Sequence, residues 1–424
     1  MWGTAAKRHS FLRPFTFFLG LGIAISTSGA DLVLQKVPPL TVAQAPNYPQ
    51  NLARIDLGAQ IESDVPSDAS SSVPFLSGDP ASVYALKTGT TRLLISLVKI
   101  ENIDSIAFLN SEAKGTVTIA LASAKLSPES PQWHEARQEE LSSGLISARI
   151  GPAEAKYVRL TFNVSSPGRI GNLGVYSAGA VSDFTMPRTR KIAAGTSAEA
   201  MAKANYNLAD LHAKARTIFV SSGDDLKLAN NMIDGQPGTA YAFAANDAAP
   251  ATINDLGRFV SVNRISTSST PGSAVVTFYV LGALPADYTG NSASALRIDS
   301  HMLAAFKTVG TSSDDGNVAV NFEETTGRYV MLVWTPSTQN ANFSVAEVAV
   351  FGPATNAKLL AANTTSGNSS DDKTVRDFKD TKDFGKEIPG EGPAEEQAPG
   401  EGPAPELPRP PPFVFIPRVV PTSP

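Results

Sequence analysis

The chain has 424 residues, a formal net charge of −5 and no cysteine. Its length allows two or three domains, and so mild a charge gives no basic face for nucleic acid or an anionic membrane. Without cysteine it has no disulfide, no thiol nucleophile and no lipoprotein acylation site, so each domain must be held together by its buried core.

Residues 1–30 have the pattern of a secretory signal peptide. Basic residues precede an apolar run of 11 residues from Phe15 to Ile25, and small residues at 28–30 suit cleavage before Asp31. Because this run is short for a bilayer span, we expect a removed signal rather than an anchor. The mature chain would then be exported to the periplasm, cell surface or medium, and the lack of cysteine favours a bacterial source. Residues 31–50, rich in Pro, Ala and Gln, are interpreted as a spacer.

Residues 51–179 have the pattern of a β-domain, with short apolar runs separated by Gly, Asn, Ser and Pro. Runs of this length and spacing indicate a sandwich or a barrel. The expected strands include Arg92–Val98, Ser105–Leu109, Thr116–Leu121 and Lys156–Phe162. The last of these alternates, which predicts Val158, Leu160 and Phe162 in the core and Tyr157, Arg159 and Thr161 on the opposite face.

Residues 180–206 are interpreted as a linker with a short helix, because Thr196 and Glu199 have capping-box spacing before an Ala-rich run. Basic residues at 188–191 form either a solvated face of this linker or a contact for a polyanion. A second β-domain is expected at 207–354. Its strands include Ala274–Leu281, Asn317–Phe322, Arg328–Trp334 and Val345–Phe351.

The two β-domains have the pattern of a tandem repeat. Three segments agree in order and approximate spacing: Asn51–Ala53 with Asn207–Ala209, Gly78–Ala85 with Gly235–Ala242, and Lys156–Val158 with Arg328–Val330. Agreement at three ordered places indicates duplication of one module.

The tail at 355–424 is rich in Pro, Gly and Glu and offers too little apolar surface to offset the entropy of ordering, which predicts disorder. Within it, Phe413–Ile416 and Val419–Val420 are apolar. They are either a weakly sticky end or a docking peptide that adds a strand to an envelope protein.

A set of short motifs in the second repeat carries a family resemblance. They are Val220–Ser222, Ala229, Ile233–Gly235, Thr239–Tyr241, Asp255–Gly257, Val262, Ile265, Arg328–Val330 and Ala346–Gly352. In this order they resemble the discoidin, or coagulation-factor type C, family of galactose-binding-like domains, which includes many bacterial carbohydrate-binding modules. The resemblance implies an all-β fold of two tandem antiparallel β-sandwiches of jelly-roll type.

The chain also departs from the family pattern. Tyr241 stands where the family usually has tryptophan, and the terminal cysteines of animal members are missing, so binding of the animal type is not expected. The first repeat is more diverged: Ser77 replaces the aspartate before Gly78, and Asn172 falls near the position of the last-strand glutamate. Trp133 falls where such domains often have a packing tryptophan.

The resemblance implies a structural calcium site in the second domain. Asp234 and Glu347 would supply carboxylates, Thr239 its hydroxyl, and the turn around Gln236 backbone carbonyls. Such hard oxygen ligands suit calcium. The alternative is that Asp234 only caps an Asx turn before Gly235.

A ligand site is expected on loops at one end of the second sandwich. Asp224, Asp225, Lys227, Asn246 and Asp247 offer carboxylate, amide and ammonium groups suited to sugar hydroxyls, and a merely solvated loop is the alternative. Tyr241 and Phe243 are expected in the core, so these loops have no evident aromatic platform.

Catalysis is not expected. His134, His212 and His301 lie far apart without metal-ligand spacing, and no nucleophile elbow or phosphate-binding loop is present. The favoured function is non-catalytic binding of extracellular or cell-surface carbohydrate. The alternatives are a structural or assembly protein of the cell envelope and an accessory subunit of an exported glycan-active enzyme.

Overall fold

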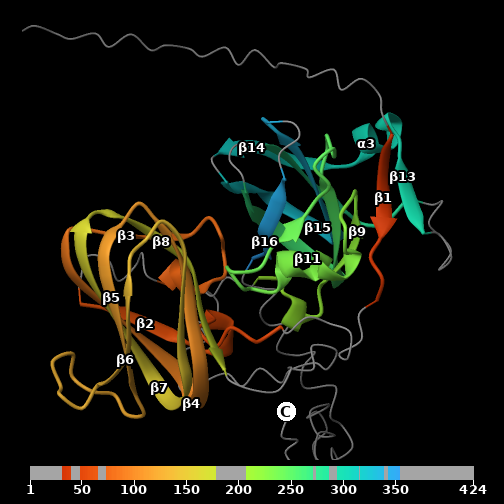
Figure 1. Cartoon of the computed structure of the whole chain (residues 1–424). Coiled ribbons are helices and arrows are strands. Elements are labelled where there is room, and N and C mark those ends of the chain that lie inside the picture. The colour runs from red at the N-terminus through yellow and green to blue at the C-terminus, as the bar shows by residue number, and fades with distance from the viewer. Residues whose placement is uncertain are drawn as a thin grey trace, which may run out of the picture. The chain divides into compact units, whose positions relative to one another are not determined.

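The computed structural model describes residues 31–39, 48–64, 73–177, 207–270, 274–285, 294–314, 316–338 and 342–353. The predicted signal at 1–30, the linker at 180–206 and the tail at 355–424 lie outside these residues. Two antiparallel sheets, one in each predicted β-domain, dominate the described part, which confirms the all-β class (Figure 1). Across the described ranges, no helix combines the length and apolarity needed to cross a membrane.

The first sheet has seven strands in the order β3-β8-β4-β7-β5-β6, with β2 paired to β4. Short 3-10 turns at Ile55–Leu57 and Val73–Leu76 precede or separate its first strands. The strands are β2 (Gln60–Ser63), β3 (Val83–Leu86), β4 (Gly89–Ser111), β5 (Lys114–Ala122), β6 (His134–Glu140), β7 (Gly144–Ser166) and β8 (Gly168–Ser177).

The long strands β4 and β7 make this sheet into a sandwich. Each has 23 residues, and their pairing is interrupted between Ser96 and Glu101. Such irregularities bend a strand and let one hydrogen-bonded sheet fold over its own core. The first half of β4 pairs with β2 and its second half with β8. The two strands expected at 92–98 and 105–109 are therefore two halves of β4.

The second sheet has nine strands in the order β13-β1-β9-β11-β15-β12-β14, with β16 paired to β11 and β10. The strands are β1 (Leu32–Lys36), β9 (Arg216–Val220), β10 (Tyr241–Ala242), β11 (Ala251–Thr270), β12 (Ala274–Leu281), β13 (Ala295–Ile298), β14 (Thr308–Asp314), β15 (Asn317–Pro336) and β16 (Ser344–Phe351). Three short helices accompany them: η4 (Leu211–Ala213), η5 (Leu226–Ile233) and α3 (Ser300–Ala305).

The interpretation as a spacer is wrong for residues 32–36 and for Tyr48, while residues 40–47 lie outside the described part of the chain. Residues 32–36 form β1, which pairs with β13 and with β9 of the second domain. Leu34 is fully buried there, in a cluster that includes Phe219, Ile253 and Met331. Tyr48 is fully buried in the main core of the same domain. The physical reason is that β9 would otherwise leave an unpaired edge and an uncovered apolar face.

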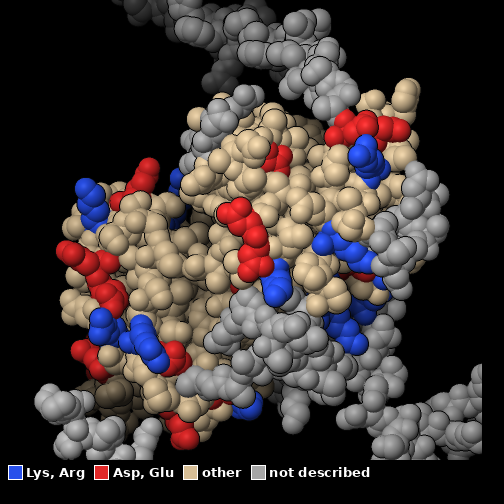
Figure 2. Space-filling model, turned by 45° about the vertical axis from the view of Figure 1, so that its right-hand side comes forward, with Lys and Arg blue, Asp and Glu red and all other residues tan. Residues whose placement is uncertain are grey.

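The alternation predicted for 156–162 is confirmed. Val158, Leu160 and Phe162 are fully buried in the first core, while Tyr157 and Arg159 lie on the outer face of β7. Acidic and basic side chains are interspersed over the face shown in Figure 2, with no single basic field. This distribution agrees with the mild net charge.

Candidate functional site

The loop before η5 displays the first group of predicted ligand-binding residues. Asp225 is the N-cap of η5, and its carboxylate accepts a hydrogen bond of 3.0 Å from the backbone N–H of Lys227. This is the ordinary role of an aspartate at a helix start. Asp224, Asp225 and Lys227 are exposed, and so is Asn246 on the neighbouring loop. The fold therefore leaves four of the five predicted polar side chains open to solvent.

Asp247 has a different position from the other four. Its Oδ2 accepts hydrogen bonds from the hydroxyls of Ser221 at 2.6 Å and Ser222 at 2.5 Å, and its Oδ1 accepts from the backbone N–H of Ala249. The Ser222 hydroxyl in turn accepts from the N–H of Ala244 at 3.0 Å. These charge-assisted bonds join the loop before η5 to the loop after β10. Asp247 thus fixes the two loops that carry the exposed groups.

Tyr241 and Phe243 lie in the core, as expected. Their rings meet edge to face with centroids 5.0 Å apart, and Phe243 packs against Trp334 and Phe343. The Tyr241 hydroxyl donates to the carbonyl of Ser222 at 2.7 Å, and burial raises its pKa. Tyr241 therefore supports the loop from below instead of forming a sugar platform.

The turn that follows η5 contains three of the predicted calcium ligands. Asp234 is buried, and its carboxylate accepts from the N–H and side-chain amide of Gln236 and from the Thr239 hydroxyl at 2.8 Å. The bond from the Gln236 N–H closes an Asx turn, and Gly235 takes φ +71°, which glycine adopts without strain. The turn-capping role of Asp234 is thus present in the structure.

Glu347, the fourth predicted ligand, is also buried, and the nearby Asp234 acts on its ionisation. Burial raises the pKa of Asp234 to about 8, even though its hydrogen bonds act in the opposite direction. Burial and the nearby Asp234 raise the pKa of Glu347 well above its usual range. Oε1 of Glu347 has no hydrogen-bond partner among the described residues. Two buried carboxyls with an open oxygen are suited to a hard cation.

The donor set at this turn is small. Nowhere in the described ranges do three His, Cys, Asp or Glu side chains gather as a metal site of such residues would require. A calcium ion here would therefore need the Thr239 hydroxyl, backbone carbonyls and water in addition to the two carboxylates. Space beside the turn is limited. A cavity of about 20 Å³ is lined by Asp234 and Gly235 together with Asn51 and Arg54, and it holds one or two waters at most.

The first sandwich contributes to the surroundings of this turn. The Gly235 carbonyl accepts a hydrogen bond from the Tyr176 hydroxyl at 3.0 Å and lies 3.4 Å from a guanidinium nitrogen of Arg54. Conversely, Asp79 in the matching turn of the first repeat forms an ion pair of 2.7 Å with Arg264. Both repeated turns are therefore covered by side chains of the other repeat.

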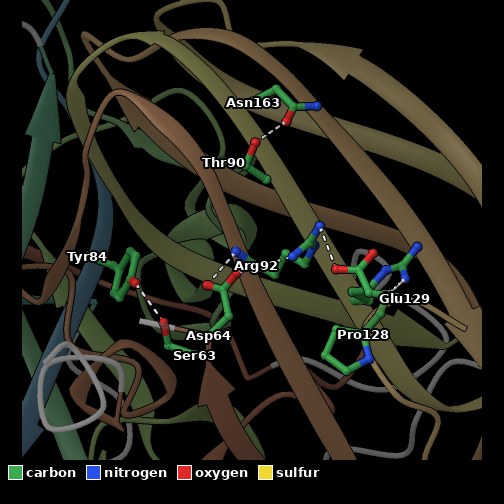
Figure 3. A network of polar contacts seen from close by, with 9 residues as sticks. Ser63, Asp64, Tyr84, Thr90, Arg92, Pro128, Glu129 and Asn163 are labelled. Atoms are coloured by element: carbon green, nitrogen blue, oxygen red, sulfur yellow. Dashed lines mark hydrogen bonds and ion pairs between the residues drawn. The ribbon is translucent and has the colours of Figure 1, made fainter. Parts of the chain in front are cut away.

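Sequence reasoning missed a charged groove on the outer face of the first sandwich. Register places Glu62 of β2 beside Leu94 of β4, and Leu94 beside Arg159 of β7. Arg92 lies two residues before Leu94 on the same face, and its side chain lies between Asp64 and Glu129 (Figure 3). The only sequence signal was the prediction that Arg159 faces away from the core.

The loop between β5 and β6 lies across this groove. Lys125 pairs with Glu62 at 2.7 Å, and Glu129 pairs with Arg92 at 3.0 Å. Trp133, predicted to pack, is indeed buried and donates from Nε1 to the carbonyl of Ser127 at 2.9 Å. The guanidinium of Arg159 lies over the Trp133 ring, 4.8 Å from its centroid. One wall of the groove is thus an arginine stacked on an indole.

The three histidines of interest occupy separate elements. His134 begins β6, His212 lies in η4 and His301 lies in α3. The structure does not bring them together at any of the sites described above.

No known protein family and no curated protein matches the sequence. The structure is similar to the chitosan-binding module 1 of a chitosanase/glucanase from Paenibacillus sp. IK-5, with 23% identity and a TM-score of 0.27, over 35% of this chain and 99% of that one. It is also similar to a fucolectin from striped bass serum (14% identity, TM-score 0.24, 72% and 98% covered). A third similar structure is allantoicase from Saccharomyces cerevisiae, with 13% identity and a TM-score of 0.27, over 72% of this chain and 93% of that one.

Proposed function

We propose that the chain is an exported, non-catalytic carbohydrate-binding protein, and that the loop end of its second sandwich holds the sugar. The observation that carries this proposal is the bonding of Asp247 to Ser221 and Ser222, which joins two loops and leaves polar side chains exposed on both. A site whose geometry is fixed before binding loses little entropy when the ligand arrives.

The exposed groups match the chemistry of a sugar ring. Each sugar hydroxyl both donates and accepts, so a site needs acceptors and donors side by side. The carboxylates of Asp224 and Asp225 accept, the ammonium of Lys227 donates, and the amide of Asn246 does both. We assign these four residues to direct contact and Asp247 to positioning. The signs of charge are mixed, which favours a neutral ligand over a polyanion.

The absence of catalysis is part of the proposal. Two carboxyls with raised pKa values often mark an active site, and Asp234 and Glu347 are such a pair. Both are at most 3% exposed, and the cavity of about 20 Å³ beside Asp234 cannot admit a sugar. Their burial supports a structural role, and we propose calcium as the ion that would neutralise them in the second sandwich.

A glycan array probed with the mature chain from Asp31 onward tests the function. We expect saturable binding to one class of neutral glycan. Asp224→Ala and Asn246→Ala should each weaken it by at least about tenfold, since each removes a direct contact. Glu324→Ala, which changes an exposed carboxylate on β15 of the same sandwich, is the matched control and should bind as the parent does.

Two outcomes would contradict the proposal. Absence of binding to every neutral glycan would favour an assembly role, to be followed by pull-downs with residues 355–424 as bait. Binding that neither loop variant weakens would place the site elsewhere on the chain.

A further inference from the structure

The groove on the first sandwich has the features of a ligand site and shares no residue with the loops of the second sandwich. It has a volume of about 100 Å³, several times the ~10–15 Å³ that one water needs, so it admits a group the size of one sugar ring. Leu94, Leu126 and Pro128 give it an apolar lining, while Arg92, Arg159 and Asp64 bring charge. An apolar lining with a few convergent polar groups is the usual make-up of a ligand site.

Two guanidinium groups face this groove from neighbouring strands. Arg92 on β4 pairs with Thr161 of β7, and Arg159 stands two residues away on β7, so the two arginines are diagonal neighbours on one face. Arg159 donates from Nη1 to the carbonyl of Pro128, but its buried Nε has no partner among the described residues. A buried N–H group without a hydrogen-bond acceptor is unfavourable, and a ligand that supplies an acceptor removes this cost.

Glu129 occupies the place that an external carboxylate would take. Its Oε1 lies 3.0 Å from Nη2 of Arg92, but its side chain is 76% exposed, against 32% for Arg92. An ion pair with so exposed a partner contributes little and is readily exchanged. Glu129 also sits on the β5–β6 loop, so it can leave Arg92 without disturbing the sheet.

We propose that this groove binds the carboxylate of an acidic sugar, a uronic acid unit of a polysaccharide, which displaces Glu129 from Arg92. A planar carboxylate accepts two parallel bonds from a guanidinium, and Arg159 supplies a further donor beside it. The ring of the sugar would pack its C–H face on Leu94 and Pro128. This site lies in a different domain and takes a charged ligand, so its test is independent of the test of the neutral-sugar site.

The charges of the groove select a sugar over other anions. Glu62 and Asp64 lie beside the arginines, and Asp64 accepts from the backbone N–H of Arg92 at 3.0 Å. These carboxylates accept hydrogen bonds from sugar hydroxyls, but they repel a second and third negative charge. A nucleic acid or a strongly acidic peptide would therefore bind poorly, whereas one carboxylate surrounded by hydroxyls suits the site.

The test is calorimetric titration of the mature chain with oligogalacturonate, oligoglucuronate and oligomannuronate, each beside its methyl ester, which differs mainly in charge. At least one acid should bind, and its ester should bind at least about tenfold more weakly. Arg92→Gln and Arg159→Lys should each weaken binding of the acid by a factor similar to that of esterification. Glu129→Gln should strengthen binding of the acid several-fold, because this substitution removes the carboxylate that competes for Arg92.

Lys99→Gln is the control, since Lys99 forms an exposed pair with Glu101 on the same strand outside the groove. It should bind as the parent does. The proposal is overturned if no acid binds, if an ester binds as tightly as its acid, or if Glu129→Gln weakens binding. Equal affinity for polyglutamate would overturn the choice of a sugar and indicate a protein partner. Asp224→Ala should leave acid binding intact, which separates this site from the loop site.

Discussion

Replacement of Glu347 by glutamine tests the electrostatics of the second sandwich. Asp234 and Glu347 are buried together, and both have raised pKa values. A carboxyl whose folded pKa lies above its unfolded value stabilises the fold at low pH, and that stability is lost as pH rises through the folded value. For Asp234 this window runs from the ordinary aspartate pKa of 3.8 to about 8. Without calcium, the second sandwich should therefore become less stable from mildly acidic to mildly alkaline pH.

The size of the effect follows from the width of that window. The difference between a pKa of about 8 and one of 3.8, at about 1.4 kcal/mol per pH unit, gives an upper bound of roughly 6 kcal/mol for Asp234 alone. In a domain of this size about 1 kcal/mol moves the melting temperature by about 2–4 °C, so roughly 6 kcal/mol corresponds to a fall of at most about 12–24 °C. Glu347→Gln removes the second buried carboxyl, whose own pKa is raised by burial and by the nearby Asp234. The melting temperature of the variant should equal that of the parent at acidic pH and exceed it at alkaline pH.

Scanning calorimetry over this pH range with EDTA measures the prediction, and hydrogen exchange of β16 peptides assigns the transition to the second sandwich. Calcium should flatten the pH dependence of the parent but not that of Glu347→Gln. Glu324→Gln is the control, because Glu324 is exposed in the same sheet. A parent whose stability rises with pH, or a variant less stable than the parent by the same amount at every pH, would refute the reasoning.

Three further changes probe the scaffold. Leu34→Ala should lower the free energy of unfolding of the second domain by about 2–5 kcal/mol, because Leu34 is the fully buried residue of β1; an unchanged denaturant midpoint would contradict the packing of β1 on that domain. Asp247→Ala should speed hydrogen exchange at 221–225 and reduce neutral-glycan binding, whereas slow exchange there would deny its positioning role. Arg328→Gln should cost about 0.5–1.5 kcal/mol, since it breaks two bonds of 2.8 and 2.9 Å to Asp255, and equal chemical-denaturation curves would contradict this.

The repeat was predictable from the sequence because matched residues of the two domains form the same hydrogen bonds. Asn51 and Asn207 each accept a hydrogen bond from the N–H two residues on, at 3.0 Å in both cases. Each also accepts from a valine N–H in the last strand of its domain, Val175 or Val350, again at 3.0 Å. A buried amide that joins the start of a domain to its end is hard to replace, so it survives when the surrounding sequence diverges.

Features that depend on pairing between distant segments could not be predicted. The five residues of β1 carry no local signal strong enough to separate a strand from a spacer, and their partner β13 lies far along the chain. The groove of the first sandwich also depends on the pairing of distant segments. Glu62 and Arg159 look like ordinary surface charges in their own strands, and only the register through Leu94 places them in one row. Local periodicity reports which face a side chain is on, but not which distant residues share that face.

The two repeated turns show how a small shift in sequence changes the chemistry of one geometry. In the second repeat the turn-closing carboxylate is Asp234, which accepts from the N–H of Gln236. In the first repeat the carboxylate lies one residue beyond the glycine, at Asp79, which accepts from the N–H of Ala81 and pairs with Arg264.

This difference leads to a prediction about which repeat calcium should stabilise. In the first repeat Asp79 already has a guanidinium 2.7 Å away, and an asparagine, Asn172, falls near the glutamate position. In the second repeat Asp234 and Glu347 are two buried carboxyls without an ion pair among the described residues. Since a buried charge must be neutralised by a proton or a counter-ion, calcium should stabilise the second sandwich and leave the first unchanged.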